Sequence, residues 1–597
     1  MTLDPQTGRK PLDFGAAGLS GSVNQDGRIV ALNAYHPEQG YVTLTSAPPF
    51  PESERYNPQA VRAYRRSLVD QEGFGLAFAE PVVARDAWMQ DDLYPCVRLT
   101  FASGRQAECL TYPFEGHSVI QRWKFSDPQT QVRFAGRAWL QRSAYTQLTE
   151  GGPLPFPAPA AQIVRQDMAS VTLYNPALPW AVSINCVSAA PGDSGSALFQ
   201  GSRPAADGAF TLVIGSGRGP AQAQRALAAA LDSAAPATPA ALWAETPEDP
   251  LLRRGLAYTL ACCAPTSGEA LCILTDHMIL PLSWNRDSYF AARALLSWKP
   301  ALWPVVRAHL LWIFETAERI NGLWGRSYLA NGRIKDRGFQ LDQQLFPIVE
   351  LFEYVRITAD RGLLERLSGQ IAPIMEALAQ HRHPTEPLYR TDETPADDPV
   401  ALPYPLSSHI LLWYALRLLA EAGFPGDWAV QAESVREAIY RHFPAVYSGS
   451  AGRVTLLAYA ADCAGRHHFY HDANDFPLVL APVWGFCSVD DPLWRATVRF
   501  AFSEDNQAGF YNGHLGSVHT RAPWALGDLQ EMVAARLSGD GTRYAKAHAA
   551  VRAAAQWDGA LSEAYDAVTG AVVSRHWFVW PNAVYACLLL GAFDNEL

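Results

Sequence analysis

The stretch Ser283-Trp284-Asn285-Arg286-Asp287 closes a long polar loop and opens a helical run, and the same arrangement recurs through the C-terminal part of the chain. Four further motifs occupy comparable loops: Asp397-Asp398, Asp472-Ala473-Asn474, His519-Thr520 and Glu563-Ala564-Tyr565-Asp566. Each of these loops follows an odd-numbered helix in our assignment. In an up-and-down array of helices such loops emerge at one end, so the motifs are expected to converge on one site.

The spacing of apolar residues changes near Leu251 to the period of 3.6 that is typical of helices. We expect about twelve helices, starting roughly at 252, 287, 301, 341, 361, 408, 429, 475, 491, 526, 541 and 581. Short links alternate with long ones, and the long links lie at 264–286, 319–340, 383–407, 445–474, 505–525 and 557–580. This alternation predicts an (α/α)6 toroid barrel, in which the long links build a pocket on one face.

The N-terminal part of the chain is expected to be a β-sandwich over residues 1–217. Residues 97–101 and 119–125 alternate apolar and polar side chains, as half-buried strands do, and turn signals such as Gly151-Gly152-Pro153 separate the runs. Residues 218–250 are rich in Ala and Pro and are expected to form a linker with one short helix at 222–231. The barrel is then expected to occupy residues 251–597.

Composition excludes several classes of function. The chain has 597 residues, a net charge of −11 and a pI near 5.8, which argues against nucleic acid and anionic membranes as partners. No signal peptide and no membrane-spanning run is visible. The nine cysteines show no paired motif and are expected to be buried, reduced thiols, so we expect a cytoplasmic location.

The pair Arg286-Asp287 is the first candidate for substrate binding. Its Asp could simply cap a helix, but Trp284 and Asn285 directly precede it, and a carboxylate held by Arg stays ionised and accepts hydrogen bonds from sugar hydroxyls. Trp324 and Asp342 lie in the next long link and are further candidates, with a solvated loop and a helix cap as the alternative interpretation.

The loop from Thr391 to Pro399 holds four acidic residues and leads into an apolar helix. Adjacent carboxylates repel one another, and this repulsion raises one pKa, which suits a general acid. A solvated acidic turn is the alternative. Glu563 lies among aromatic residues before the final helix, where a partly desolvated carboxylate suits a base that activates water.

Two other motifs have simpler explanations. The run from His467 to Asp472 contains three His and one Asp, but its spacing fits no familiar zinc site, so a polar wall is the better interpretation. The sequence Gly192-Asp193-Ser194-Gly195-Ser196 is similar to the nucleophile loop of trypsin-like proteases. It lacks a suitable His context, so a turn between strands is favoured, and a serine hydrolase stays as a hypothesis that a serine-directed reagent tests.

Taken together, the motifs of the C-terminal part resemble glycoside hydrolase family 125, the metal-independent exo-α-mannosidases, and more distantly the glucoamylase-like (α/α)6 hydrolases. The similar segments are Trp284-Asn285-Arg286-Asp287-Ser288, Pro395-Ala396-Asp397-Asp398, Asp472-Ala473-Asn474 with Pro477, His519-Thr520, and Trp577-Phe578 with Trp580. The resemblance covers roughly residues 275–590, and the chain departs from the family at Asn285 and around Glu563-Ala564-Tyr565-Asp566.

The resemblance implies an inverting exo-α-glycosidase that needs no metal or other cofactor and acts on an oligosaccharide or glycoside. One Asp of the 397/398 pair would be the acid, with Asp397 favoured, and Glu563 the base. The substrate-binding residues would be Trp284, Asn285, Arg286, Asp287, Trp324, Asp342, Asp472, Asn474, His519 and Trp577. The departures leave mannose and glucose both open, so a glucoamylase- or trehalase-like α-glucosidase is one alternative and a non-catalytic sugar-binding protein is another.

Overall fold

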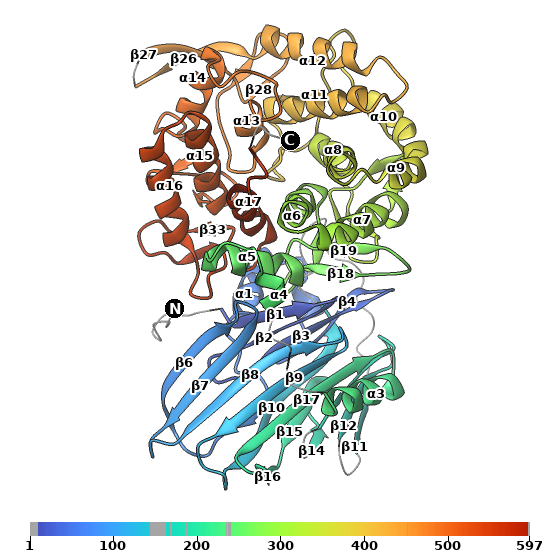
Figure 1. Cartoon of the computed structure of the whole chain (residues 1–597), viewed down its shortest axis with the longest axis vertical. Helices are drawn as coiled ribbons and strands as arrows, with labels where there is room; N and C mark the ends of the chain where they lie inside the picture. Colours follow the sequence, from blue (N-terminus) through green and yellow to red (C-terminus); the bar gives the residue numbers. More distant parts are fainter. Residues whose placement is uncertain are drawn as a thin grey trace. The chain divides into compact units, whose positions relative to one another are not determined.

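The computed structural model describes residues 10–143, 163–166, 170–185, 188–233, 236, 240–450 and 452–594. The expected turn at 151–153 lies outside these residues. The chain forms two compact units (Figure 1). Unit 1 comprises Met1–Leu282, Leu329–Asn331 and Trp557–Gly559, and unit 2 comprises Ser283–Tyr328, Gly332–Gln556 and Ala560–Leu597. The boundary after Leu282 corrects the expected boundary at 251, because the first regular helix of the C-terminal part, α5 (Pro250–Ala261), belongs to unit 1.

Unit 1 is built on two antiparallel sheets. One has nine strands in the order β1-β2-β3-β4-β10-β15-β14, with β5 and β16 also pairing β10. Its strands are β1 Leu12–Ala16, β2 Leu19–Val23, β3 Ile29–His36, β4 Gly40–Thr45, β5 Gly75–Ala77, β10 Gln131–Arg142, β14 Ser188–Pro191, β15 Ala197–Gln200 and β16 Ser202–Pro204. The other has eight, in the order β11-β12-β13-β17-β9-β8-β7-β6. These are β6 Val82–Gln90, β7 Tyr94–Phe101, β8 Gln106–Phe114, β9 Ser118–Phe125, β11 Ile163–Gln166, β12 Val171–Asn175, β13 Trp180–Ile184 and β17 Ala209–Gly217.

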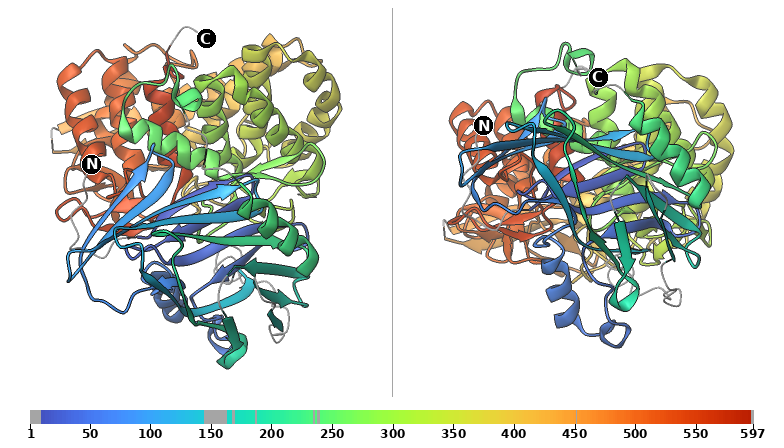
Figure 2. Two further views of the ribbon diagram at one scale, coloured as in Figure 1. Left: turned by 60° about the horizontal axis from the view of Figure 1, so that its bottom comes forward. Right: turned by 90° about the horizontal axis from the view of Figure 1, so that it is seen from below.

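The two sheets share one apolar core, to which the nine-stranded sheet contributes Leu44 and Leu140 and the eight-stranded sheet contributes Leu99 and Trp123. The strands predicted at 97–101 and 119–125 are confirmed within β7 and β9. Figure 2 shows the strands of unit 1 from two further sides. Alternation of side chains along each strand therefore places one face of each sheet in the common core.

The segment expected to be a linker is partly folded onto this domain. Helix α3 (Pro220–Leu231) packs on the outer face of the eight-stranded sheet, where Leu227 and Ala230 join Tyr112, Ile120 and Val213 in a small apolar cluster. The predicted helix at 222–231 is confirmed, but it belongs to unit 1 because its apolar stripe matches that face. The short helices α1 (Pro58–Ser67) and α4 (Ala240–Trp243) complete the helices described in unit 1.

A buried charge network explains why a late segment of the chain belongs to unit 1. Asp558 accepts ion pairs from Lys10 at 2.8 Å and from Arg254 at 3.0 Å, and Arg254 also pairs with Asp13 at 2.6 Å. Burial alone raises the pKa of Asp13, but Arg254 and Lys10 outweigh burial and hold that pKa well below its usual range. The network therefore ties residues far apart in sequence into one ionised cluster.

Unit 2 is mainly helical, with small two- and three-stranded sheets in its links. The starts of its helices agree with the sequence, except that the helix expected from 361 is divided into α9 and α10 by a 3-10 helix at Ser368–Gln370. With α5, the expected starts all lie within two residues of those in the structure. The helices are α6 Asn285–Trp298, α7 Trp303–Leu311, α8 Leu341–Thr358, α9 Arg361–Leu367, α10 Ile371–Ala379, α11 Leu406–Glu421, α12 Trp428–His442, α13 Pro477–Leu480, α14 Pro492–Ala501, α15 Ala525–Leu537, α16 Gly541–Ala554 and α17 Val579–Leu589.

Six of these helices contact one another in a closed sequence. Helix α6 packs on α8, α8 on α11, α11 on α13, α13 on α15, α15 on α17, and α17 returns to α6. Figure 1 shows these six helices around a common centre, with α7, α9, α10, α12, α14 and α16 outside them. The motif-bearing loops all precede the N-termini of the six inner helices, which places the motifs at corresponding positions around the ring.

Two further findings concern membrane-spanning helices and cysteines among the described residues. Among them, no helix combines the length and apolar character needed to cross a membrane. The eight described cysteines are free thiols, six of them buried and two, Cys463 and Cys487, partly exposed.

Glu350 on α8 gives a prediction about stability. It is 1% exposed, neither carboxyl oxygen has a hydrogen-bond partner among the described residues, and burial raises its pKa well above 4.5, with a further contribution from Glu353. The folded chain therefore binds a proton that the unfolded chain releases above pH 4.5, so Glu350 removes stability as pH rises. Each unit by which folding raises the pKa of Glu350 lowers the free energy of unfolding by about 1.4 kcal/mol. This full effect applies at pH values above the pKa of Glu350 in both the folded and the unfolded chain.

We expect Glu350→Gln to flatten this dependence. Thermal unfolding midpoints of wild type and variant should diverge in favour of the variant between pH 4.5 and pH 8, because only the wild type has the carboxyl group to titrate. A difference between the two proteins that is the same at both pH values would contradict the buried, protonated state.

Candidate active site

Arg286 is the centre of a buried group of charges in unit 2. Its Nη1 donates to Asp342 Oδ2 at 2.9 Å and to Gln340 Oε1 at 3.3 Å, and its Nη2 lies 3.5 Å from Asp397 Oδ1. Its guanidinium also lies 5.0 Å from the centre of the Trp580 ring. The starts of α6, α8 and α17 and the acidic loop before α11 thus meet at one arginine.

The starts of α6 and α8 are fastened together directly. Asn285 Nδ2 donates to the carbonyl oxygen of Gln343 at 2.9 Å, and the backbone N–H of Arg286 donates to Gln343 Oε1 at 3.2 Å. Asn285 therefore holds two helix starts in register. Asp287 lies in the first turn of α6, where the helix dipole favours a negative charge, and its carboxylate is 3.7 Å from Arg286 Nε.

The acidic loop before α11 folds around Thr394. The Thr394 N–H donates to the carbonyl oxygen of Asp398 at 2.7 Å, and the Asp397 N–H donates to that of Thr394 at 3.0 Å. This tight turn places Asp397 at φ 64, in the left-handed region. A residue other than glycine there costs about 1–3 kcal/mol, and such strain is concentrated at functional sites.

The environment of Asp397 favours its charged form. Burial raises its pKa, but Arg286, Arg326 and a hydrogen bond from Gln340 Nε2 at 2.7 Å outweigh burial, so the pKa lies below its usual value. The adjacency of two carboxylates predicted a rise, and for Asp397 that expectation is wrong in the ligand-free protein, because cations recruited from α6 and the 319–340 link dominate. Burial instead raises the pKa of Asp342 and of Glu393.

Glu563 lies in a second charged group beside the first. It is 4% exposed, its Oε1 pairs with Arg575 Nε at 3.1 Å, and its N–H donates to the carbonyl oxygen of Arg575 at 3.1 Å. The Arg575 guanidinium lies 5.4 Å from the centre of the Trp284 ring. Its charge also contributes to lowering the pKa of Asp397, so the two charged groups are neighbours.

His519 joins the two groups. Its Nδ1 is 3.2 Å from Asp398 Oδ1, and this hydrogen bond, with the charge of Glu563 adding to it, raises the pKa of His519 to about 9. The other oxygen of Asp398, Oδ2, is buried and has no hydrogen-bond partner among the described residues. Asp398 therefore has one oxygen paired with His519 and one buried oxygen without a hydrogen-bond partner among the described residues.

The state of His519 can be followed by NMR. Because its folded pKa is raised, the imidazolium and its pair with Asp398 are fully present below pH 6.5 and are lost as pH rises through about 9. We expect a histidine signal that titrates near pH 9, is absent from His519→Asn and moves toward pH 6.5 in Asp398→Asn. A His519 titration near pH 6.5 in the wild-type protein would contradict the pairing.

Asp472 and Asn474 form a third polar group. Asp472 is fully buried and accepts hydrogen bonds from Tyr470, from Ser517 Oγ at 2.7 Å and from Asn474 Nδ2 at 2.7 Å. Burial raises its pKa. The link between this group and the Arg286 cluster is Asp475, whose pKa burial raises well above its usual range, with Asp472 and Asp342 adding to the rise.

One of the expected aromatic residues, Trp324, makes a hydrogen bond and a ring contact outside the two charged groups. Trp324 is 2% exposed, its Nε1 donates to the carbonyl oxygen of Ile313 at 3.1 Å, and Arg319 covers its ring at 4.7 Å. Trp577 is also 2% exposed and follows β34 (Val572–Ser574). Trp324 thus packs against Arg319 of its own link. Trp284 and Trp580, by contrast, lie against the arginines of the two charged groups.

Several residues of the site were missed from the sequence. Gln340 Nε2 bridges Asp397 and Glu393, at 2.7 and 3.2 Å, and Arg326 Nη1 pairs with Glu393 at 3.0 Å. Arg575 is the partner of Glu563. The sequence feature that could have identified Gln340 is its position directly before α8. Its side chain makes no hydrogen bond that caps this helix. Arg326 and Arg575 lie in long links but outside the motifs identified there.

The His467–Asp472 run and the Gly192–Ser196 run have the following surroundings in the structure. His471 Nε2 is 2.9 Å from Gln530 Oε1, whereas His467 Nε2 is 2.9 Å from the carbonyl oxygen of His442, so these imidazoles point to different partners. No group of three or more metal-ligating side chains lies together in the described ranges. Residues Asp193–Gly195 form a short turn between β14 and β15, and the side chain of Ser194 lies outside the described residues.

Comparison with known proteins finds similarity to a family of glycoside hydrolases. Residues 378–590 match the family model of metal-independent alpha-mannosidases (GH125). The Meiotically up-regulated gene 157 protein of Schizosaccharomyces pombe is 25% identical over 222 residues, which are 35% of this chain and 42% of that protein. The chain thus spans less than half of the length of this curated relative.

Two solved structures complete the comparison. A bacterial glucoamylase complexed with acarbose aligns with 100% of this chain and 95% of its own, with 13% identity and a TM-score of 0.68. A metal-independent alpha-mannosidase of Streptococcus pneumoniae, in a non-productive complex with alpha-1,6-mannobiose, covers 60% of this chain and 96% of its own, with 20% identity and a TM-score of 0.49. The chain therefore has the fold of the glucoamylase throughout, and its resemblance to the GH125 mannosidases is confirmed over residues 378–590.

Proposed function

We propose that the protein is an inverting, exo-acting α-glycosidase with an (α/α)6 catalytic barrel. The closed sequence of contacts through six inner helices supports the barrel. The observation that carries the activity is the meeting of the Asp397-Asp398 pair with Glu563 through Arg286, Arg575 and His519. Two buried carboxyl groups with separate partners are the arrangement that glycoside hydrolysis uses.

Each group has a defined task in this proposal. Arg286, fixed by Asp342 and Gln340, presents donors to the hydroxyls of the terminal sugar, and Asp287 accepts hydrogen bonds from them. Glu563, held beside Arg575, removes a proton from water on one face of the sugar, while an acid of the 397/398 pair protonates the leaving oxygen on the other. Because no group forms a covalent bond to the sugar, the product has the opposite anomeric configuration.

The sugar is identified by release from defined substrates. The match of residues 378–590 to the mannosidase model supports mannose, so we expect monosaccharide from α-mannosides and not from α-glucosides. Release of glucose alone would assign the protein to the α-glucosidases instead. Binding of sugars without any release would leave the non-catalytic alternative and overturn the enzymatic proposal.

Activity is expected to withstand chelation of metals. The proposed steps use carboxylates and water, and Arg286 and Arg575 supply the positive charges that a metal would otherwise supply. Hydrolysis rates before and after exhaustive treatment with EDTA should agree. Loss of activity that zinc or calcium restores would overturn this and would direct attention to His471 and Asp472.

A further inference from the structure

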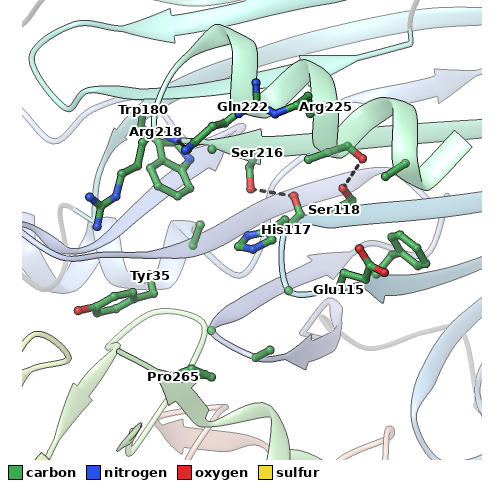
Figure 3. A pocket seen from close by; sticks show the side chains of 18 of the residues that line it. Tyr35, Glu115, His117, Ser118, Trp180, Ser216, Arg218, Gln222, Arg225 and Pro265 are labelled. Carbon is green, nitrogen blue, oxygen red and sulfur yellow. Dashed lines mark hydrogen bonds between the residues drawn. The ribbon is translucent and has the colours of Figure 1, made fainter. Parts of the chain in front are cut away.

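A pocket of about 750 Å³ lies in unit 1, away from every residue of the candidate active site in sequence and in unit assignment. It forms where the turns β1–β2 and β8–β9 meet strand β3, the end of β17 and helix α3. Figure 3 shows its polar and aromatic lining, with the α3 side opposite the side of Tyr35 and Pro265. The lining on the α3 side includes Trp180, Arg218, Gln222 and Arg225.

The charge of the lining is unusual for this protein. Arg218 and Arg225 both line the pocket and are exposed, and neither has an ion-pair partner in the described part of the chain. Glu115 is the one carboxylate of the lining, so the pocket carries a net charge of +1 with His117 neutral, in a chain of net charge −11. Two guanidinium groups at the edges of one pocket, without an ion-pair partner among the described residues, favour an anionic ligand.

The walls are held in place before any ligand arrives. Ser118 Oγ donates to the carbonyl oxygen of Ala226 at 3.0 Å, which fastens α3 to β9. Ser216 Oγ donates to the carbonyl oxygen of His117 at 2.9 Å, which fastens the β8–β9 turn to β17. A preformed site loses less free energy to ordering when a ligand binds, so these two bonds make the pocket a competent binding site.

The size and the apolar surface of the pocket indicate more than a bare anion. Sites for small organic molecules have volumes of about 300–1,000 Å³, and the present pocket lies in that range. Trp180 and Tyr35 provide aromatic surface, and Ala34, Ala226 and Pro265 provide aliphatic surface. Aromatic and aliphatic groups beside donors such as Gln222 match the carbon face and the hydroxyl edge of a sugar ring.

We propose that this pocket binds a sugar that carries an anionic group, either a phosphate ester or a carboxylate. The positive charges of Arg218 and Arg225 attract the anionic group, and Trp180, Tyr35 and Gln222 contact the ring. The pocket shares no residue with the candidate catalytic group, because every residue of its lining belongs to unit 1 and the candidate catalytic residues belong to unit 2.

Calorimetric titration of the full-length chain tests this. The probes are glucose 6-phosphate, glucuronate, glucose and inorganic phosphate, and Glu563→Gln serves as the receptor so that the candidate active site does no chemistry. We expect both anionic sugars to bind, with affinity that falls at high salt, and glucose and phosphate alone to bind at least about tenfold more weakly. The stronger of the two anionic probes then identifies phosphate or carboxylate as the preferred group.

Variants separate this pocket from other sites. Arg218→Ala combined with Arg225→Ala, in the same background, should lose the binding of the anionic sugars. The matched control is Arg62→Ala on α1, also exposed and outside the pocket lining. Hydrolysis of an activated aryl α-glycoside should be unchanged when the two arginine substitutions are made in the wild-type chain. Undiminished binding of the anionic sugars by the double variant would overturn the proposal. Binding of glucose as tight as that of the anionic sugars would also overturn it. Binding of inorganic phosphate as tight as that of the anionic sugars would overturn the part of the proposal that concerns a sugar ring.

Discussion

Replacement of Glu563 by Gln is expected to reduce the hydrolysis of every α-glycoside substrate by about 10²–10⁴-fold, the usual contribution of a general base. The amide keeps the size of the side chain, but it accepts no proton from water. Every substrate needs the activated water whatever its leaving group, so activated aryl glycosides and natural-type disaccharides should lose rate to a similar degree. The measurement is kcat/KM for both substrates in wild type and variant.

The control for this experiment is a Glu→Gln change at another buried Glu that lies beside an Arg, outside the candidate active site. Glu353 on α8 is buried, accepts a hydrogen bond from Tyr414 at 2.8 Å and lies 3.6 Å from Arg293 Nε. Glu353→Gln therefore changes the same chemical group in the same helical unit, and should affect stability more than turnover. If Glu353→Gln slowed hydrolysis as much as Glu563→Gln, the effect at Glu563 would be structural and the base would have to be sought elsewhere.

External azide gives a further readout for Glu563. A small nucleophile that enters the space left by the missing base attacks the anomeric carbon without needing to be deprotonated. We therefore expect azide to restore part of the rate of Glu563→Gln, or of the smaller Glu563→Ala, toward an activated glycoside, and to leave the wild-type rate unchanged. A structural defect offers no such rescue.

Periodicity alone predicted the starts of the C-terminal helices to within two residues, except for α10, which was expected to be part of the helix from 361. The signal was strong because each helix follows a polar loop and buries an apolar stripe, as α11 does after the acidic turn at 391–399. The domain boundary could not be found in this way. Helix α5 has the same periodicity as the others, but contacts distant in sequence, such as Arg254 with Asp13 and Asp558, place it in unit 1.

In the candidate site, too, some residues could be predicted from the sequence and others could not. The carboxylates and Arg286 were found because they lie in motifs in the loops before helices or, for Arg286, at a helix start. Their electrostatic partners could not be found, because these come from other loops: Gln340 and Arg326 act on Asp397, and Arg575 pairs with Glu563. Sequence proximity of Asp397 and Asp398 indicated a raised pKa, whereas the folded chain surrounds Asp397 with cations. Charge arrangements that the tertiary structure assembles are not visible in local sequence.

The cations around Asp397 affect its suitability as the proton donor. Asp397, favoured by its likeness to the leading carboxylate of the paired acids in glucoamylases, carries a lowered pKa in the ligand-free protein. Its side chain is still 15% exposed. A sugar that covers this remaining surface adds desolvation, which raises the pKa of a carboxyl group, so binding of substrate moves Asp397 toward the protonated form that a donor needs.

Asp397→Asn is therefore expected to lower kcat/KM by about 10²–10⁴-fold for substrates with poor leaving groups, and far less for activated aryl glycosides, which depart without a proton. Asp398→Asn should lower the rates of both substrate classes alike, because it removes the partner of His519 and a ligand contact. Asp360→Asn, which alters a paired carboxylate at the start of α9, is the control for loss of charge. Leaving-group dependence in Asp398→Asn instead would transfer the role of the acid to Asp398.

The anomeric configuration of the released sugar tests whether the reaction uses an acid from the Asp397-Asp398 pair together with Glu563 as the base. Inversion requires room for a water molecule between base and sugar, and carboxyl groups about 6.5–9.5 Å apart provide it, whereas a retaining pair stands near 5 Å. Proton NMR of the first sugar released from an α-linked substrate should therefore show the β-anomer before mutarotation. An α-anomer appearing first would require a covalent intermediate. Glu563, held by Arg575, would then be a nucleophile, and the azide rescue and leaving-group series would have to be interpreted again for two chemical steps.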